Sequence, residues 1–191
     1  MPADATRIPL LVVVTGPPAA GKSTIARGLA AEVGLPLLEK DAIKEQLYET
    51  IGYGDRQASR EIGAAAFALL FDLTERLLEA GISFVLEANF AVETAEDWFV
   101  RLPTCRVLQL LVTAPDEIVL ERYRARASSE ERHPGHADIE ALPEVERSVA
   151  TGRHGALAVP GRLLELDTST HVDVASVAEL VRGELQASYA P

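Results

Sequence analysis

Short apolar runs alternate with longer amphipathic stretches along the 191 residues of the chain. Such alternation is typical of β-α-β units, in which helices connect parallel strands. The predicted strands are Leu10–Thr15, Leu37–Glu39, Ile82–Leu86, Val107–Val112 and Arg162–Leu166. The pattern therefore predicts an α/β fold with a five-stranded parallel sheet and helices on both faces.

Helices are predicted between these strands from apolar spacing and from residues that start or stop helices. The longest is recognised by apolar residues at helical spacing, namely Ile62, Ala66, Leu69, Leu73 and Leu77. The predicted helices are Lys22–Gly34, Ala42–Thr50, Arg56–Ala80, Ala95–Leu102 (capped by Thr94), an arginine-bearing helix from the Thr113–Asp116 capping pattern to about Arg126, Pro143–Thr151, and a terminal helix capped by Thr170–Asp173. Between two of them, Ser128–Asp138 is predicted to be irregular and mobile.

The composition fits one domain over residues 1–191, since this length can bury a sizeable core. No apolar run is long enough to cross a membrane, and the N-terminal residues lack a signal-peptide pattern. One cysteine, Cys105, fits a reducing compartment. We therefore expect a cytoplasmic protein with no membrane partner, and the sequence leaves its oligomeric state open.

Net charge argues against a polynucleotide partner. The formal charge is −11, whereas proteins that grip nucleic acid usually carry a basic surplus. A local basic cluster nevertheless exists at Arg122, Arg124, Arg126 and Arg132. The balance favours a small-molecule partner.

Gly16–Ser23 matches the pattern G-x-x-x-x-G-K-[ST] in full, between an apolar strand and a helix. Glycines let backbone N–H groups approach phosphate oxygens, and the helix N-terminus adds a favourable dipole. Lys22 would place its charge between the β- and γ-phosphates, and the hydroxyl of Ser23 would ligate Mg²⁺. The predicted nucleotide-binding residues are Gly16, Pro17, Ala19, Ala20, Gly21, Lys22, Ser23 and Thr24, with ATP or GTP and Mg²⁺ as cofactors.

Asp41 follows the second predicted strand, at the sheet edge where open α/β folds bind ligands. A carboxylate there could accept the proton of a hydroxyl that attacks the γ-phosphate. Asp is equally a preferred N-cap, so Asp41 could simply start the helix Ala42–Thr50. Spacing alone does not separate the two interpretations.

Four segments in order, GPPAAGKST, LEKDAIKEQL, VLEANF and RHPGH, resemble the small P-loop kinases. This group includes zeta-toxin-like kinases, chloramphenicol phosphotransferase, polynucleotide 5′-kinases and many proteins labelled AAA family ATPases. The resemblance covers roughly residues 10–136. It implies that Asp41 is the catalytic base, that Lys44 contacts the acceptor or a phosphate, and that Glu87 holds Mg²⁺ directly or through water. Asn89 would contact the acceptor or the γ-phosphate, although a solvated Glu87 and a turn-forming Asn89 are the plain alternatives.

Arg122 and Arg126 are four residues apart and share a helix face. Kinases of this type place arginines in a lid over the phosphates, where they offset charge on the transferred group. We expect such a lid at about residues 122–140, with Arg132, His133 and His136 recognising the acceptor. An exposed charged helix is the simpler alternative.

Further acceptor contacts are predicted at the start of the longest helix, from Tyr53, Arg56 and Arg60. The loop after the last strand, with Asp167 and Thr168, is expected to hold adenine, as it does in related kinases. The leading hypothesis is a phosphotransferase that moves the γ-phosphate of ATP to a hydroxyl of a sugar, nucleoside-like metabolite or antibiotic. A polynucleotide 5′-hydroxyl kinase and a nucleotide-dependent regulatory ATPase remain as alternatives.

Overall fold

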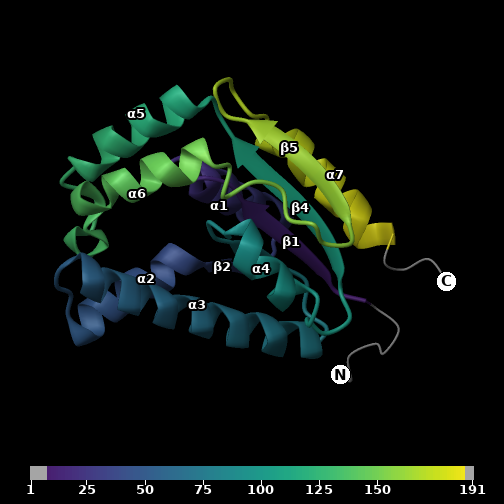
Figure 1. Cartoon of the computed structure of the whole chain (residues 1–191). Helices are drawn as coiled ribbons and strands as arrows, with labels where there is room; N and C mark the ends of the chain where they lie inside the picture. Colours follow the sequence, from purple (N-terminus) through teal and green to yellow (C-terminus); the bar gives the residue numbers. More distant parts are fainter. Residues whose placement is uncertain (1–7, 188–191) are drawn as a thin grey trace.

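A computed structural model describes residues 8–187; residues 1–7, which include most of the N-terminal segment considered above, and 188–191 lie outside the described part. Its strands are β1 (Leu10–Thr15), β2 (Leu37–Glu39), β3 (Phe84–Glu87), β4 (Arg106–Thr113) and β5 (Arg162–Asp167). They pair in parallel in the order β2-β3-β1-β4-β5 (Figure 1). The predicted class of fold is confirmed.

Helices connect the strands as expected for a parallel sheet. They are α1 (Lys22–Val33), α2 (Lys40–Ile51), α3 (Arg56–Glu79), α4 (Val92–Phe99), α5 (Asp116–Ala127), α6 (Asp138–Ala150) and α7 (Val174–Ala187), with a 3-10 turn at Pro134–His136. In Figure 1, α5 and α6 lie on the opposite side of the molecule from α2 and α3. Within residues 8–187, no helix is both long and apolar enough to cross a membrane.

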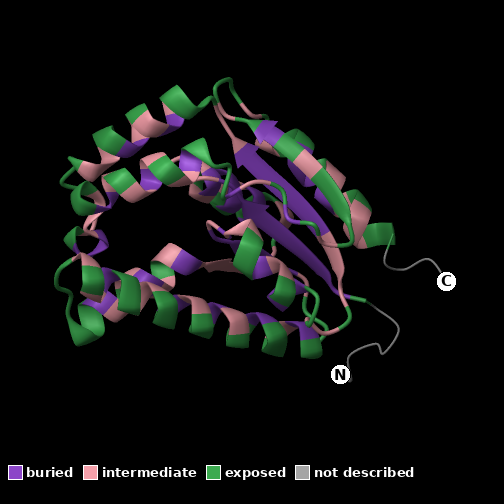
Figure 2. Cartoon of the chain, viewed as in Figure 1, coloured by how far each residue is buried: buried purple, intermediate pink, exposed green. Residues whose placement is uncertain are grey.

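The core has two layers, one on each face of the sheet, and β1 contributes to both. Leu10, Val12 and Val14 pack in the layer with α1 and α7, whereas Leu11 and Val13 pack in the layer with α3 and α4. All five side chains are at most 1% exposed, in the buried strip of Figure 2. Because successive residues of a strand point to opposite faces, a strand buried on both faces has a continuous apolar sequence.

Helices α4 and α6 begin several residues before their predicted starts. The first N–H of α4, on Val92, donates to the carbonyl of Arg153 at 3.0 Å, so this tertiary contact starts the helix without a cap at Thr94. Helix α6 begins at Asp138 and carries the predicted start, Pro143, in its interior. Acidic residues in its first turn favour the earlier start, since they complement the helix dipole.

The caps of α5 and α7 also differ. Pro115 precedes α5, and no side chain caps that helix, so the predicted Thr113 cap is wrong. At α7 the cap is Asp173, whose carboxylate accepts a hydrogen bond from the N–H of Ala175 at 3.1 Å. Thr170, the first residue of the predicted pattern, therefore lies too far before the helix to cap it. Only the aspartate of that pattern caps the helix.

Apolar residues lie on two sides of α3, so the sequence pattern did not identify the side that is buried. Leu69 and Leu73 are 44% and 39% exposed, although their spacing matches a helical stripe. The buried residues of α3 are Ser59, Ala66, Leu70, Thr74 and Leu78. The buried side of α3 therefore includes two hydroxyl side chains, of Ser59 and Thr74, that an apolar pattern does not detect.

Adjacent leucines on α3 test this assignment. We expect Leu70→Ala to lower the free energy of unfolding by about 2–5 kcal/mol, because Leu70 is fully buried. The matched variant Leu69→Ala should change it by less than about 1 kcal/mol. Urea unfolding of both variants measures the difference, and similar losses would contradict the assigned faces.

Candidate active site

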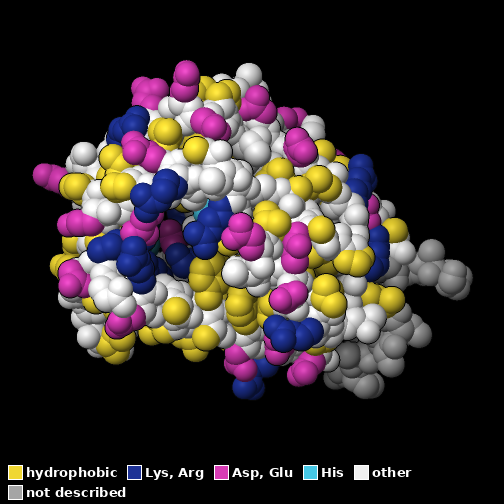
Figure 3. Space-filling view, viewed as in Figure 1, with side chains coloured by type: hydrophobic (Ala, Val, Ile, Leu, Met, Phe, Trp, Pro, Cys, Tyr) yellow, Lys and Arg dark blue, Asp and Glu magenta, His cyan; other side chains and the backbone are white. Residues whose placement is uncertain are grey.

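One cavity of about 790 Å³ lies at the carboxyl ends of β1, β2 and β3, between α2 and α3 on one side and α5 and α6 on the other. Basic side chains dominate its lining, although the whole chain is acidic. Its nine lysines and arginines are Lys22, Lys40, Lys44, Arg56, Arg60, Arg122, Arg126, Arg132 and Arg153, against the acids Asp41, Glu87, Asp138 and Glu144. Figure 3 shows basic side chains around a hollow on this face. The cavity is therefore suited to an anionic ligand.

The segment Gly16–Thr24, here called the phosphate loop, connects β1 to α1. A Cβ at Gly16, where φ is +138°, would lie 2.0 Å from the carbonyl oxygen of Val112, so only glycine fits. Gly21 also has a positive φ, directly before α1. The loop residues that line the cavity are Pro18, Ala19, Gly21, Lys22, Ser23 and Thr24. Gly16, Pro17 and Ala20, which we predicted as nucleotide contacts, shape the loop without lining the cavity.

Lys22, Ser23 and Glu87 meet at the floor of the cavity. Lys22 is 7% exposed, and its Nζ donates to the carbonyl of Pro17 at 2.8 Å. Ser23 Oγ lies 3.3 Å from Glu87 Oε2 at the end of β3. Burial lowers the pKa of Lys22, an effect that Glu87 opposes, and burial raises the pKa of Glu87. Glu87 is 4% exposed, which excludes a solvated carboxylate.

Asp41 lies in the first turn of α2, with 36% of its side chain exposed. Its carboxylate accepts hydrogen bonds from Lys40 Nζ at 2.6 Å and from Arg132 Nη2 at 3.3 Å. Burial would raise the pKa of Asp41, but the two cations outweigh it and hold that pKa well below the usual range. The N-cap of α2 is Glu39, so the interpretation of Asp41 as an N-cap is wrong.

Lys44 belongs to a buried network that joins α2, α3 and the 3-10 turn. Its Nζ donates to Ser59 Oγ at 3.0 Å, and Ser59 Oγ in turn donates to the carbonyl of His136 at 3.1 Å. Burial lowers the pKa of Lys44 to about 8 and that of His136 to about 4. His136 Nε2 lies 2.8 Å from Glu45 Oε1. His136 therefore anchors this turn on α2 as well as lining the cavity.

The segment predicted to be irregular and mobile packs closely on α2. Arg132 lies between Asp138 at 2.8 Å, Asp41 at 3.3 Å and Glu45 at 3.4 Å. Gly135 touches Tyr48, since a Cβ there would lie 2.8 Å from its ring. These contacts hold residues 128–138 against α2, with a 3-10 turn in place of a fully irregular loop.

The two predicted lid arginines of α5 both line the cavity, in different surroundings. Arg122 donates to Oγ1 of Thr168 at 2.9 Å and to its carbonyl at 2.8 Å. Arg126 lies over the ring of Tyr123 and 3.5 Å from Asp138, and its buried Nε has no hydrogen-bond partner among residues 8–187. Of these two arginines, Arg126 is the one with an N–H group that has no hydrogen-bond partner among the described residues.

Four further predicted site residues lie outside the cavity lining. Tyr53 and His133 do not line the cavity; their rings pack together 5.1 Å apart, and His133 Nε2 lies 2.9 Å from Glu49. Asp167 is exposed and accepts a hydrogen bond from the N–H of Ser169. Thr168 also lies outside the lining, but its Oγ1 is 2.8 Å from the carbonyl of Ala20 in the phosphate loop.

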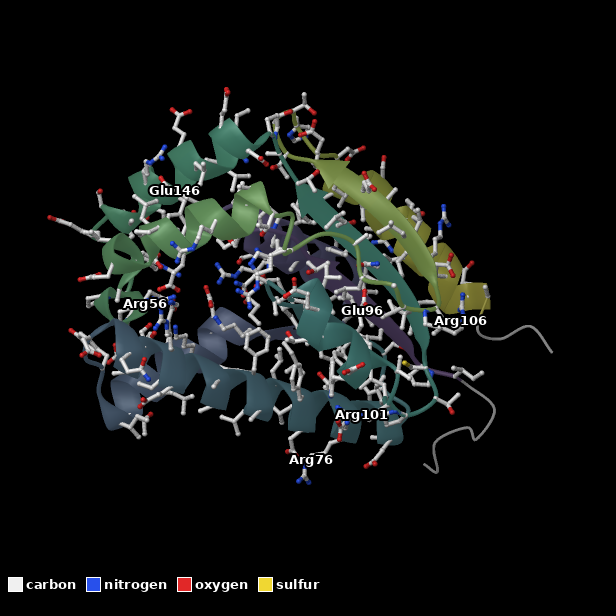
Figure 4. The ribbon with its side chains drawn as sticks, in the orientation of Figure 1. Arg56, Arg76, Glu96, Arg101, Arg106 and Glu146 are labelled. Atoms are coloured by element: carbon white, nitrogen blue, oxygen red, sulfur yellow. The ribbon has the colours of Figure 1, made fainter. Side chains whose placement is uncertain are left out.

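Arg56, Arg60 and Asn89 line the cavity as predicted. Both arginines form ion pairs with Glu144 of α6, and Figure 4 shows Arg56 between α3 and α6, whereas Arg76 and Arg101 lie on the outer side. The lining residues that sequence reasoning missed include Lys40, Ser59, Phe67, Phe71, Asp138, Glu144, Arg153 and His154. Of these, only Lys40 had a usable signal, its position beside Asp41.

Comparison with known proteins shows the family to which the chain belongs. The AAA_33 family model, described as an AAA domain, matches residues 11–150. A UPF0200 protein from Aeropyrum pernix is 37% identical over 131 residues, which cover 64% of this chain and 67% of that protein.

Solved structures extend the likeness to the whole fold. A "putative kinase" from Chloroflexus aurantiacus superposes with a TM-score of 0.84 and 32% identity, over 93% of this chain and 98% of that one. A sugar kinase from Janibacter sp. HTCC2649 has a TM-score of 0.58 at 21% identity, over 96% and 99% of the two chains, and shares the fold. With its phosphate loop and five-stranded parallel sheet, the chain belongs to the AAA_33 family and has the fold of the small P-loop kinases.

Proposed function

We propose that this protein is an ATP-dependent phosphotransferase that moves the γ-phosphate to a hydroxyl of a small molecule, with Asp41 as the general base. One observation carries the proposal: an ionised carboxylate on α2 lines the same cavity as Lys22 of the phosphate loop. A general base must reach the hydroxyl that it deprotonates, and a phosphate donor must lie in line with it. Similarity over 93% of the chain to the protein described as a "putative kinase" supports this class of reaction.

The residues of the floor fit a nucleotide and a magnesium ion. Gly16 and Gly21 hold the positive φ angles that allow backbone N–H groups to surround phosphates. The hydroxyl of Ser23 and the carboxylate of Glu87 are hard oxygen donors 3.3 Å apart, which suits Mg²⁺. Mg²⁺ in such sites is held mainly by phosphates and water, with one or two protein ligands.

Three cavity residues, Lys22, Arg126 and Asp41, have defined parts in the proposed reaction. Lys22 and Arg126 would offset negative charge on the phosphates, with Mg²⁺ supplying further charge neutralisation when bound. Asp41 would orient the acceptor hydroxyl and take its proton. Its low pKa keeps it ionised at neutral pH and makes it a weak base. A weak base suffices where the proton moves late, as in a loose phosphoryl-transfer transition state.

Lys22 gives the first test. We expect Lys22→Ala to abolish measurable phosphoryl transfer, because its ammonium would act on the transferred group. The matched variant Arg27→Ala removes a 65%-exposed cation from the same helix and should leave the rate unchanged. Circular dichroism of both variants checks that the fold is kept, and parental activity in Lys22→Ala would contradict the assigned nucleotide site.

Glu87 tests the metal site. We expect Glu87→Gln to raise severalfold the Mg²⁺ concentration needed for half-maximal activity, since a neutral amide is a weaker ligand. Glu39→Gln, at the end of β2 and outside the cavity lining, is the matched control. An unchanged magnesium titration in Glu87→Gln would exclude Glu87 from metal binding.

Asp41 tests the base. With sugars, nucleosides and hydroxylated antibiotics as acceptors, we expect Asp41→Asn to lower acceptor-stimulated ADP production by on the order of 10²–10⁴-fold. Nucleotide affinity should hold, because the phosphate loop is untouched, and slow hydrolysis of ATP by water should fall much less.

Glu45→Gln controls for electrostatics. Glu45 pairs with the same arginine as Asp41 but lies outside the cavity lining. Glutamine keeps an oxygen that accepts a hydrogen bond from Arg132, so Glu45→Gln removes the charge but not the contact and should have little effect on the rate. Stimulation that survives Asp41→Asn intact would remove Asp41 from the mechanism. If no hydroxyl compound stimulates the parent enzyme, a regulatory ATPase is the better description.

A further inference from the structure

Beyond Asp41 the cavity continues along a wall that differs from the rest of its lining. Three aromatic side chains line it: Phe67 and Phe71 from α3, and Phe90 just after β3. Ala64, Ala91 and Ala95, from the same segments, also line the cavity. We call this set of six residues the aromatic wall. In Figure 3, hydrophobic side chains adjoin the basic ones at the lower border of the hollow.

The aromatic wall begins one side chain away from the proposed base. Lys40 Nζ lies 2.6 Å from Asp41 and 5.6 Å from the ring centroid of Phe67. The Phe67 ring in turn lies 5.6 Å from that of Phe71 and 6.0 Å from that of Phe90. A molecule whose hydroxyl reaches Asp41 therefore has this wall beside its remaining atoms.

The chemistry of the wall points to its ligand. Phe67 and Phe71 are only half-buried, so a flat apolar group that covers them would gain from the area removed from water. The wall contains no carboxylate. Polar residues of the lining close to it in sequence or space are Lys40, Asn89, Thr94, His154 and the exposed Arg153. A free sugar would bury several hydroxyls there with few partners, which is unfavourable.

We infer that the acceptor of the proposed reaction carries an apolar ring that packs on the aromatic wall while its hydroxyl meets Asp41. This inference rests on the proposed function and narrows its substrate class from hydroxyl compounds in general to ring-bearing alcohols. The nucleobase of ATP is the rival occupant. The sheet order places the wall on the β3 side of the phosphate loop, whereas Thr168 and Arg122 lie on the β4–β5 side, where the base was predicted.

The protein contains a built-in reporter for this wall. Trp98, the single tryptophan, stacks on Phe71 with ring centroids 4.0 Å apart. In the presence of Mg²⁺ and ADP, its fluorescence can be titrated with 1-phenyl-1,2-ethanediol and with 1,2-propanediol. The two probes share a diol and differ in one group, phenyl against methyl. We expect the phenyl compound to bind saturably, with a Kd at least about tenfold lower, as burial of an aromatic ring predicts.

Two pairs of variants locate the binding. Phe67→Leu keeps an apolar side chain but removes the ring, and should raise the Kd for the phenyl compound severalfold. Phe99→Leu removes a ring from the same aromatic cluster outside the cavity lining, and should leave that Kd unchanged. Ala64→Met should fill the space beside the wall and raise the Kd for the phenyl compound. Ala65→Met adds the same side chain at an exposed position outside the lining and should leave that Kd unchanged. Because Ala64 is exposed, this pair does not depend on the core staying intact.

The outcomes separate this inference from the proposed function. Equal affinities for the two diols, or an unchanged Kd in both Phe67→Leu and Ala64→Met, would overturn the ring-bearing acceptor. A higher KM for ATP in Phe67→Leu, with phenyl binding unchanged, would assign the wall to the nucleobase and overturn it as well. If alcohols without a ring accelerate ADP production and ring-bearing alcohols do not, the phosphotransferase stands and the ring-bearing acceptor is wrong. If the phenyl diol binds as expected but no hydroxyl compound accelerates ADP production, the wall stands as a binding site and the phosphotransferase is wrong.

Discussion

The guanidinium of Arg132 bonds to three carboxylates, two on α2 and one on α6, and the shape of the cavity depends on these contacts. Only 15% of the Arg132 side chain is exposed, so the ion pairs lie in a medium that screens them weakly. They join the segment after α5 to the helix that carries Asp41. The same arginine thus borders the site and adds to the effect of Lys40 in lowering the pKa of the proposed base.

Charge is distributed unevenly between the surface and the site. A formal charge of −11 disfavours long-range attraction of polyanions, whereas the cavity gathers most of its charged lining from lysine and arginine. A small anion gains from this local field once it enters the cavity, and a long polyanion would also meet the acidic exterior. The overall composition and the local site therefore favour the same class of ligand, a compact phosphate compound.

Part of this site could be predicted from the sequence, because its residues are consecutive or directly follow a strand. The phosphate loop consists of consecutive residues, and Asp41 and Glu87 follow strands whose carboxyl ends meet at one sheet edge. The aromatic wall was not readable, because Phe67 and Phe90 are distant in sequence and meet only through the packing of α3 on the sheet. The start of α4 was missed for the same reason, since a carbonyl from residue 153 satisfies its first N–H.

The close packing of Gly135 on Tyr48 gives the site a mechanical property. Gly135 has no side chain between its backbone and the ring of Tyr48 on α2, so even a methyl group at this position would push the two apart. Displacement there would lengthen every bond that Arg132 makes across the same gap, including the one to Asp41. A substitution at Gly135, which lies outside the cavity lining, would therefore alter the charge around the proposed base from a distance, through the segment that carries Arg132.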